Sequence, residues 1–222
     1  MISQPVTTCP SRFLESGLVF QWVSKLLLGT VRPRIVSELS FLMGGASLEE
    51  GKEDEVGRID NVLVRVKAAK LEWCALEMQA VYFSGRTMQS DFAIMRTWSG
   101  PGSPFPSGQR RPDFRSSGPK RLMPQLQVKV PTLRRWGKKM AVVVDRPFWE
   151  SLGEMKRVPN ISNSDIVWFV VSHNGPSRGR YRLALHDTVP TTLENAIEGL
   201  TGGTPVSLEQ FEASIRRKLS RL

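Results

Sequence analysis

Two acidic residues and one glutamine are the side chains of this chain best placed to do chemistry. Asp60 enters a stretch in which apolar and polar residues alternate, and Glu77 lies within a second, more apolar stretch, with Gln79 two residues later. Because side chains alternate between the faces of a strand, Glu77 and Gln79 share one face. Burying a carboxylate among apolar residues costs free energy unless it is paired or binds a cation. The pattern therefore indicates a functional site.

The chemistry that suits such a pair of carboxylates is metal-assisted hydrolysis. Two carboxylates on neighbouring strands repel each other, and a divalent cation that prefers oxygen ligands, such as Mg2+, allows both to stay ionised. Such a cation polarises a phosphoryl oxygen and lowers the pKa of water, which is what phosphodiester hydrolysis requires. Spacing alone still favours a purely structural role, since an Asp followed at a distance by Glu-x-Gln occurs by chance in many proteins.

The charge of the chain is unevenly distributed. The 222 residues carry a formal net charge of +10, with 31 Lys and Arg against 21 Asp and Glu. Residues 110–139 hold ten basic residues and one acid, whereas residues 1–60 carry six basic and eight acidic residues. A basic run with so few acids attracts a polyanion, and the prolines and glycines before it favour DNA over a merely solvated surface. The phosphate-binding candidates are Arg111, Arg115, Lys120, Arg121, Arg134 and Arg135.

Hydrophobic patterns predict an α/β chain around these residues. Residues 58–67 and 72–84 have the patterns of neighbouring strands in one sheet. Helical spacing predicts a helix over 13–28 and a second from Pro33 to the glycines at 44 and 45, with Glu38 on it. Further strands are expected at 140–144, 166–171 and 181–185, and further helices at 119–137, 148–155, 191–199 and from 207, the last two opened by capping boxes at Thr191 and Ser207. An acidic connector is expected at 46–57 and a long loop at 99–118.

The cysteines and the hydropathy pattern exclude several classes of protein. Cys9 and Cys74 have neither metal-ligand spacing nor the density of a disulfide scaffold, which favours a reducing, cytoplasmic setting. The longest apolar stretch, residues 17–28, is interrupted by polar side chains and is too short to span a bilayer. We therefore expect neither a secreted protein nor a membrane protein.

Three longer strings resemble the NotI family of type II restriction endonucleases. They are EWCALEMQAVYFSG at 72–85, RRPDFRSSGPKRLMPQLQVKVPTLRRWGKKMAVVVD at 110–145 and HDTVPTTLENAIEGLTGG at 186–203. The resemblance covers most of residues 33–203. It divides the chain into an N-terminal helical appendage (1–32), an endonuclease domain (33–203) and a C-terminal helix (204–222).

The resemblance implies a restriction-endonuclease-like PD-(D/E)XK core, a mixed sheet flanked by helices in the order αβββαβ, with helical additions at both termini. Asp60 and Glu77 match its metal-binding pair, with Mg2+ as the cofactor. Gln79 matches the position that most members fill with Lys, and the NotI type uses Gln there. Gln is a neutral amide, which neither acts as a general base nor brings a positive charge. The metal must then do more of the work, and Gln79 would position the attacking water.

Other acidic residues are alternative candidates for the metal ligands. Ile59 rather than Pro precedes Asp60, so Asp54 and Glu55 are alternatives for the first metal ligand. Glu38 matches an extra acid that some members place near the metal. The four-cysteine iron site of the NotI type is not matched by the two cysteines present. We expect Cys9 to be a remnant of that site in a chain that lacks upstream residues.

The resemblance also implies partners. They are double-stranded DNA, at a long G+C-rich palindrome whose guanines arginines would recognise, and a second copy of the chain in a symmetric homodimer. A cognate DNA methyltransferase belongs to such a system. The alternative to an active enzyme is a catalytically inactive or truncated DNA-binding relic, while an RNA-binding protein is disfavoured because no aromatic RNP-like strand is found. His173 and His186 stand at the ends of expected strands, and we expect both to be structural.

Overall fold

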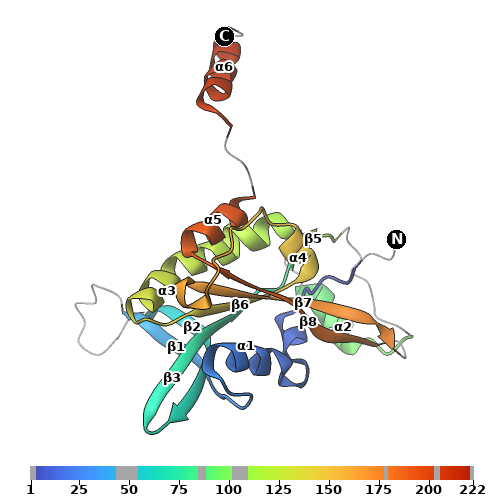
Figure 1. Ribbon diagram of the computed structural model, residues 1–222. Helices are drawn as coiled ribbons and strands as arrows, with labels where there is room; N and C mark the ends of the chain where they lie inside the picture. Colours follow the sequence, from blue (N-terminus) through green and yellow to red (C-terminus); the bar gives the residue numbers. More distant parts are fainter. Residues whose placement is uncertain are drawn as a thin grey trace, which may run out of the picture.

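A mixed six-stranded sheet with helices on both faces forms the body of the molecule (Figure 1). The computed structural model describes residues 4–43, 55–84, 89–101, 110–177, 180–202 and 206–220. In spatial order, the strands are β1 (Arg34–Met43), β2 (Glu55–Lys67), β3 (Lys70–Met78), β6 (Met140–Asp145), β7 (Ile166–Ser177) and β8 (Arg180–Thr191). The predicted α/β class, with a mixed sheet flanked by helices, is confirmed.

The sheet combines parallel and antiparallel pairs. β3 pairs in parallel with β6, and β6 in parallel with β7, whereas the other neighbours are antiparallel. β6 is buried along its whole length, as expected of a parallel strand covered on both faces. The strands predicted at 58–67, 72–84, 140–144, 166–171 and 181–185 are confirmed. The stretch 72–84 is divided into β3 and the short β4 (Tyr82–Phe83), which pairs with β5 (Pro112–Asp113).

Helices cover both faces of this sheet (Figure 1). The helices of the described residues are η1 (Pro10–Gly17), α1 (Leu18–Leu28), α2 (Gln89–Thr97), η2 (Ser116–Leu122), α3 (Met123–Arg135), α4 (Arg146–Glu150), η3 (Ile161–Asn163), α5 (Leu193–Thr201) and α6 (Leu208–Leu219). η1 and α1 bury Phe13 and Val23 against Leu76, while α3 and α5 bury Leu126 and Leu200 on the other face. The N-terminal helices thus share a core with the sheet, and the predicted division at 1–32, 33–203 and 204–222 stays a prediction.

The basic helix predicted at 119–137 is confirmed as α3, preceded by the π-helical η2. η2 continues into α3 without a break in helical dihedrals, so Pro124 and Pro131 both lie within helical backbone. The chain crosses from the carboxyl end of β3 to the amino end of the parallel strand β6, and α3 makes this return. The segment before α3 therefore lies near the carboxyl end of β3.

The helix predicted to follow Pro33 is wrong, since β1 occupies this stretch and pairs with β2. Val36 and Leu39, three residues apart, line the same apolar groove, and this spacing imitates a helix. Glu38 lies between them with a φ of 55°, where the chain departs from regular strand geometry. Pairing with β2 satisfies the backbone groups that a helix would have satisfied. The two glycines at 44 and 45 lie outside the described residues.

The first residues of α4 and α5 differ from the predicted helix starts, and the start of α6 agrees. The hydroxyl of Thr192, not that of Thr191, caps α5 by accepting the Asn195 N–H. Thr191 is instead buried at the end of β8, where its hydroxyl accepts from the indole N–H of Trp168 at 3.0 Å. The helix predicted at 148–155 is the shorter α4. The capping box at Ser207 is confirmed at the start of α6.

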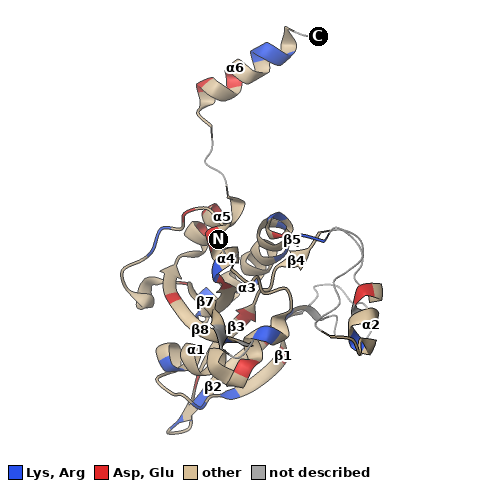
Figure 2. Ribbon diagram, turned by 90° about the vertical axis from the view of Figure 1, so that its right-hand side faces the viewer, with Lys and Arg blue, Asp and Glu red and all other residues tan. Residues whose placement is uncertain are grey.

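The C-terminal helix α6 stands apart from the sheet in both views (Figures 1 and 2). None of its residues is buried. None of the helices within the described ranges is long and apolar enough to cross a membrane. Most of the predicted acidic connector at 46–57, and the central part of the predicted loop at 99–118, lie outside the described residues.

Candidate active site

Glu77 and Gln79 lie at the carboxyl end of β3, in the interior of the sheet. Glu77 belongs to the part of β3 that pairs with β6, and the backbone N–H of Gln79 donates to the Val143 carbonyl at 2.9 Å. Both residues are buried, with 3% and 4% of their surface exposed. Ala75 belongs to the core under α3 and Leu76 to the opposite core, so alternation directs the Glu77 side chain toward α3.

Asp60 lies opposite Glu77 on the neighbouring strand β2. The antiparallel register pairs Asn61 with Leu76, so Asp60 and Glu77 occupy the next facing positions. The side chain of Asp60 is 53% exposed, whereas that of Glu77 is 4% exposed. The structure thus brings together the two acids that the sequence singles out, one at the surface and one buried.

Glu38 extends this row of acids to the edge strand β1. The β1–β2 register places it at the level of Asp60. Its side chain is 76% exposed and lies 3.7 Å from the guanidinium of Arg58. Glu38 is therefore at the rim of the acid pair and on a strand, not on a helix as predicted. Of the two alternatives for the first acid, Asp54 lies outside the described residues and Glu55 begins β2, away from Glu77.

Lys129 of α3 joins the two acids, although in the sequence it counts only as one residue of the basic segment. Its ammonium donates to Oε2 of Glu77 at 2.6 Å and lies 3.5 Å from Oδ1 of Asp60. Lys129 is 5% exposed. Its spacing is the signal that could have identified it, because it follows Leu126 by three residues and so falls on the apolar face of α3. We refer to Asp60, Glu77 and Lys129 as the acid–lysine cluster.

The acid–lysine cluster combines two carboxylates with one ammonium. Burial raises the pKa of Glu77 to about 7; the Lys129 ammonium opposes this rise and the Asp60 carboxylate adds to it. Mg2+ is usually held by one or two carboxylates together with water and substrate phosphate oxygens, and Asp60 and Glu77 offer such a pair. Across the part of the chain that the structure describes, no group of three or more His, Cys, Asp or Glu could hold a metal. A metal here would therefore take its remaining ligands from water and substrate.

The amide of Gln79 is held by the backbone beside the acid–lysine cluster. Its Nε2 donates to the Ala80 carbonyl at 2.6 Å, so its Oε1 is left to accept a hydrogen bond. An amide oxygen can orient a water molecule by accepting one of its protons in a hydrogen bond. It supplies no positive charge.

Four of the predicted DNA-binding residues lie near the carboxyl end of β3. The Ser84 N–H donates to the Arg111 carbonyl at 2.8 Å, and the Arg121 guanidinium lies 3.7 Å from the centroid of the Tyr82 ring. These contacts tie the basic segment to the chain that directly follows Gln79. We refer to four exposed residues as the proximal basic group: Arg111, Arg115, Lys120 and Arg121.

Arg134 forms ion pairs on the surface at the far end of α3, and its predicted DNA contact stays a prediction. Its guanidinium donates to both carboxylate oxygens of Asp165, at 2.9 and 2.6 Å, and to Glu194 at 3.0 Å. Hydrogen bonds to Asp165 and then to Glu194 raise its pKa. These two carboxylates stabilise the guanidinium in this position. Arg135 is exposed at the same end of α3.

The histidines and cysteines lie outside the acid–lysine cluster. Nε2 of His173 forms a hydrogen bond with the Thr7 hydroxyl at 2.7 Å, and His186 is exposed on β8. Cys9 is exposed before η1, and Cys74 is buried within β3. Two such separate thiols do not fit the four-cysteine iron site of the NotI type.

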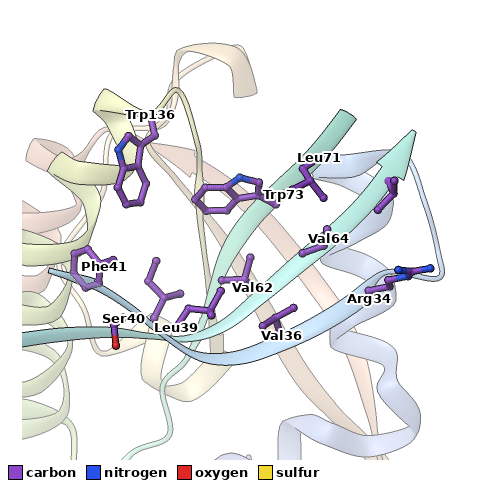
Figure 3. A pocket seen from close by; sticks show the side chains of 12 residues that line it. Arg34, Val36, Leu39, Ser40, Phe41, Val62, Val64, Leu71, Trp73 and Trp136 are labelled. Atoms are coloured by element: carbon purple, nitrogen blue, oxygen red, sulfur yellow. The ribbon is translucent and has the colours of Figure 1, made fainter. Parts of the chain in front are cut away.

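An apolar groove lies on the α3 face of β1, β2 and β3 (Figure 3). Val36 forms part of its floor, and Trp73 and Trp136 line it with ring centroids 6.1 Å apart. Its polar lining consists of Arg34 and Ser40. The groove therefore offers few groups for chemistry, and the acid–lysine cluster is the better candidate active site.

Comparison with protein-family models matches residues 2–183 to the family described as Restriction endonuclease NotI. Comparison with curated proteins and with solved structures finds no significant match. The matched residues include the acid–lysine cluster, Gln79 and the proximal basic group. The chain therefore belongs to the NotI restriction endonuclease family and is a type II restriction endonuclease that acts on DNA.

Proposed function

We propose that this endonuclease requires Mg2+ and hydrolyses phosphodiester bonds in double-stranded DNA at a G+C-rich palindrome. The observation that carries the proposal is the facing pair Asp60 and Glu77, close to the proximal basic group in a chain of the NotI family. In this proposal Asp60 and Glu77 hold the metal and Gln79 positions the attacking water. Glu38 is an additional acid at the rim.

The order of the elements that contact the six-stranded sheet around Asp60 and Glu77 supports a PD-(D/E)XK core. From α1 to β6 the chain forms a helix, three strands, a helix and a strand, with β4, α2, β5 and η2 inserted between β3 and α3. The candidate metal ligands stand on the second and third of these strands. This is the arrangement that resemblance to the nuclease superfamily predicts.

Hydrolysis requires an oriented water, stabilised charge on the phosphate and a protonated leaving oxygen. A bound Mg2+ supplies a Lewis acid that polarises the phosphate and lowers the pKa of water. Asp60 and Glu77 would hold this ion, and Oε1 of Gln79 would accept a hydrogen bond from the attacking water. The water oxygen bonds to phosphorus while the bond to the leaving oxygen breaks. The proton released by the water passes to solvent, and the leaving oxygen takes a proton from solvent.

The proximal basic group is proposed to hold the DNA backbone. Each phosphate that these side chains neutralise releases counterions, so affinity should fall steeply with salt. A homodimer with two-fold symmetry would present two acid–lysine clusters to the two strands of a palindrome. A cognate DNA methyltransferase would protect the same site in the host.

The direct test is digestion of a long, unmethylated, G+C-rich DNA by the purified chain in Mg2+, with an EDTA control and a Glu77→Ala control. Discrete fragments that disappear with EDTA and with Glu77→Ala are the expected result, and sequencing their ends gives the target. Fragments that persist in EDTA would contradict the requirement for a metal. A smear of random lengths would contradict recognition of one palindrome.

A second candidate is a catalytically inactive DNA-binding relic of a restriction enzyme. The neutral Gln79 at a position that most PD-(D/E)XK nucleases fill with Lys favours this candidate. It predicts a folded protein that retards DNA in a gel but leaves that DNA intact in Mg2+. The digestion experiment therefore separates the two candidates.

A further inference from the structure

We propose that Lys129 supplies the catalytic positive charge that the third motif position, occupied by Gln79, lacks. The inference rests on the proposed function and extends it to a residue of α3. Its basis is the place of the Lys129 ammonium between the two acids, 2.6 Å from Glu77 and 3.5 Å from Asp60.

The contacts of Lys129 fix its ammonium at the acid–lysine cluster. A third acceptor, Oε1 of Gln125, lies 2.8 Å away, one helical turn earlier on the same face of α3. The Lys129 side chain is only 7% exposed. A packed helix therefore positions this cation, unlike a lysine on the surface that samples many rotamers.

A purely structural ion pair explains this lysine poorly. Removing an ammonium and a carboxylate from water costs free energy that their attraction barely offsets, and apolar residues of similar volume often serve a fold equally well. The neighbours of Lys129 on this face, Leu126, Val130 and Leu133, are apolar and fully buried. A charge retained among them, directed at both candidate metal ligands, is better explained by a chemical task.

That task is stabilisation of the charge that develops on the phosphate. A phosphodiester held by the cation that Asp60 and Glu77 would bind lies within reach of the Lys129 ammonium, which contacts both acids. As the water oxygen bonds to phosphorus and the leaving oxygen departs, negative charge grows on the phosphate oxygens, and a prepositioned ammonium stabilises it. Lys129 keeps its protons throughout, since the water gives its proton to solvent and the leaving oxygen is protonated by solvent.

This role predicts opposite effects of Lys129→Met on metal binding and on cleavage. Removing a positive charge next to two carboxylates should tighten the binding of Mn2+, used as a probe without DNA, by about tenfold in calorimetry at about pH 8.5. The same variant should cleave DNA at least about 100-fold more slowly under single-turnover conditions with saturating Mg2+. A lysine that merely held Glu77 in place would weaken both properties when removed.

Two further variants keep the test decisive. Lys139→Met is the matched control, because Lys139 is a half-buried lysine whose ammonium donates to the Ser164 carbonyl at 2.6 Å, and neither property should change. The exchange variant, Gln79→Lys with Lys129→Gln, retains one ammonium beside Glu77 even if Lys129→Met fails to fold. Its cleavage rate should come within about tenfold of the wild-type rate, since only the origin of the charge has changed.

Three outcomes would overturn the role of Lys129: weaker or unchanged Mn2+ binding by Lys129→Met, cleavage by this variant within about threefold of wild type, or a folded exchange variant without activity. Failure of the proposed function gives a different pattern. A wild-type protein that cuts no DNA overturns both proposals. An active wild type with an equally active Lys129→Met variant overturns the role of Lys129 alone.

Discussion

Asp60 and Glu77 face each other across β2 and β3, yet the Asp60 side chain is 53% exposed and the Glu77 side chain 4% exposed. The difference follows from topology. Glu77 stands on β3, which has β2 on one side, β6 on the other and α3 above it, whereas Asp60 stands one strand nearer the edge of the sheet. A ligand therefore reaches the pair from the side of Asp60, while Glu77 provides a fixed anchor.

Replacing Glu77 by Ala should abolish cleavage and spare DNA binding. The variant removes the buried candidate metal ligand, so the rate of cleavage in Mg2+ should fall at least about 100-fold. Losses of about this size are typical when one charge-stabilising group is removed from an active site. Binding of the same DNA in Ca2+, measured by gel retardation, should change little because the proximal basic group is intact. Glu72→Ala is the control, since Glu72 lies on the same strand and pairs with Arg65 at 3.7 Å. Wild-type cleavage by Glu77→Ala would show that the site is misassigned.

Asp60→Asn and Glu38→Gln should differ in their effects. Asp60 lies 3.5 Å from Lys129 and opposite Glu77, so loss of its charge should lower both Mn2+ affinity and cleavage at least about tenfold. Glu38 points to solvent beside Arg58, and its loss should change either property by less than about threefold. Calorimetry measures the Mn2+ affinity of each variant, and single-turnover assays measure its cleavage rate. A larger effect of Glu38→Gln than of Asp60→Asn would make Glu38 the principal ligand.

The sequence predicts that Asp60 and Glu77 face each other, because each lies in a stretch with a clear strand pattern. Consecutive strands usually pair, so two such stretches separated by a short turn are expected to form a hairpin. β2 and β3 do so, with Lys67 opposite Lys70. The strands β6 and β7 were equally predictable, since short continuous apolar runs are typical of parallel strands covered on both faces.

The remaining parts depend on contacts between distant segments. Lys129 meets Glu77 across 52 positions of the chain, and nothing in the spacing of the basic segment distinguishes it from its neighbours except its place on the apolar face. Arg134 is neutralised by Asp165 and Glu194, which local sequence does not place beside it. The apolar residues of β1 have helical spacing because irregular geometry at Glu38 changes their period. In each case a tertiary contact or a local distortion outweighs the local pattern.

Substitutions in the proximal basic group should weaken DNA binding in a salt-dependent way. Arg115 is exposed near the carboxyl end of β3, and loss of one phosphate contact should reduce the slope of log affinity against log salt by about 1. Arg115→Ala should show this reduction in titrations of fluorescent DNA at several salt concentrations. An unchanged slope would remove Arg115 from the DNA interface.

Arg134→Ala should behave differently from Arg115→Ala, although both remove one arginine. Arg134 binds Asp165 and Glu194, so its loss should lower the free energy of unfolding by about 0.5–1 kcal/mol, allowing for solvent screening at a half-exposed side chain. The salt slope of DNA binding should stay at the wild-type value. Urea unfolding measures the free energy of unfolding, and the DNA titrations at several salt concentrations measure the slope. A reduced slope would place Arg134 in the DNA interface, as the sequence predicts.

His173 should make the protein less stable in acid. Burial lowers the pKa of His173 and Arg12 lowers it further, while Asp145 and Glu15 act in the opposite direction. Because the pKa in the folded state lies below the unfolded value of about 6.5, the fold binds this proton less tightly than the unfolded chain does. The stability that His173 contributes is therefore present above about pH 6.5 and is lost as the pH falls toward the folded pKa.

The corresponding test compares wild type with His173→Gln, whose amide can retain the hydrogen bond to the Thr7 hydroxyl. Urea unfolding at about pH 8 and about pH 5.5 should show a larger loss of stability for the wild type, since only the wild type must protonate this position on unfolding. Burial raises the pKa of Asp145 and His173 lowers it, so His173→Gln reports the effect of His173 together with its interaction with Asp145. His186→Gln, a change at an exposed histidine, should leave the wild-type pH dependence in place. Equal losses in wild type and His173→Gln would mean that the fold accepts a charged His173 at no cost.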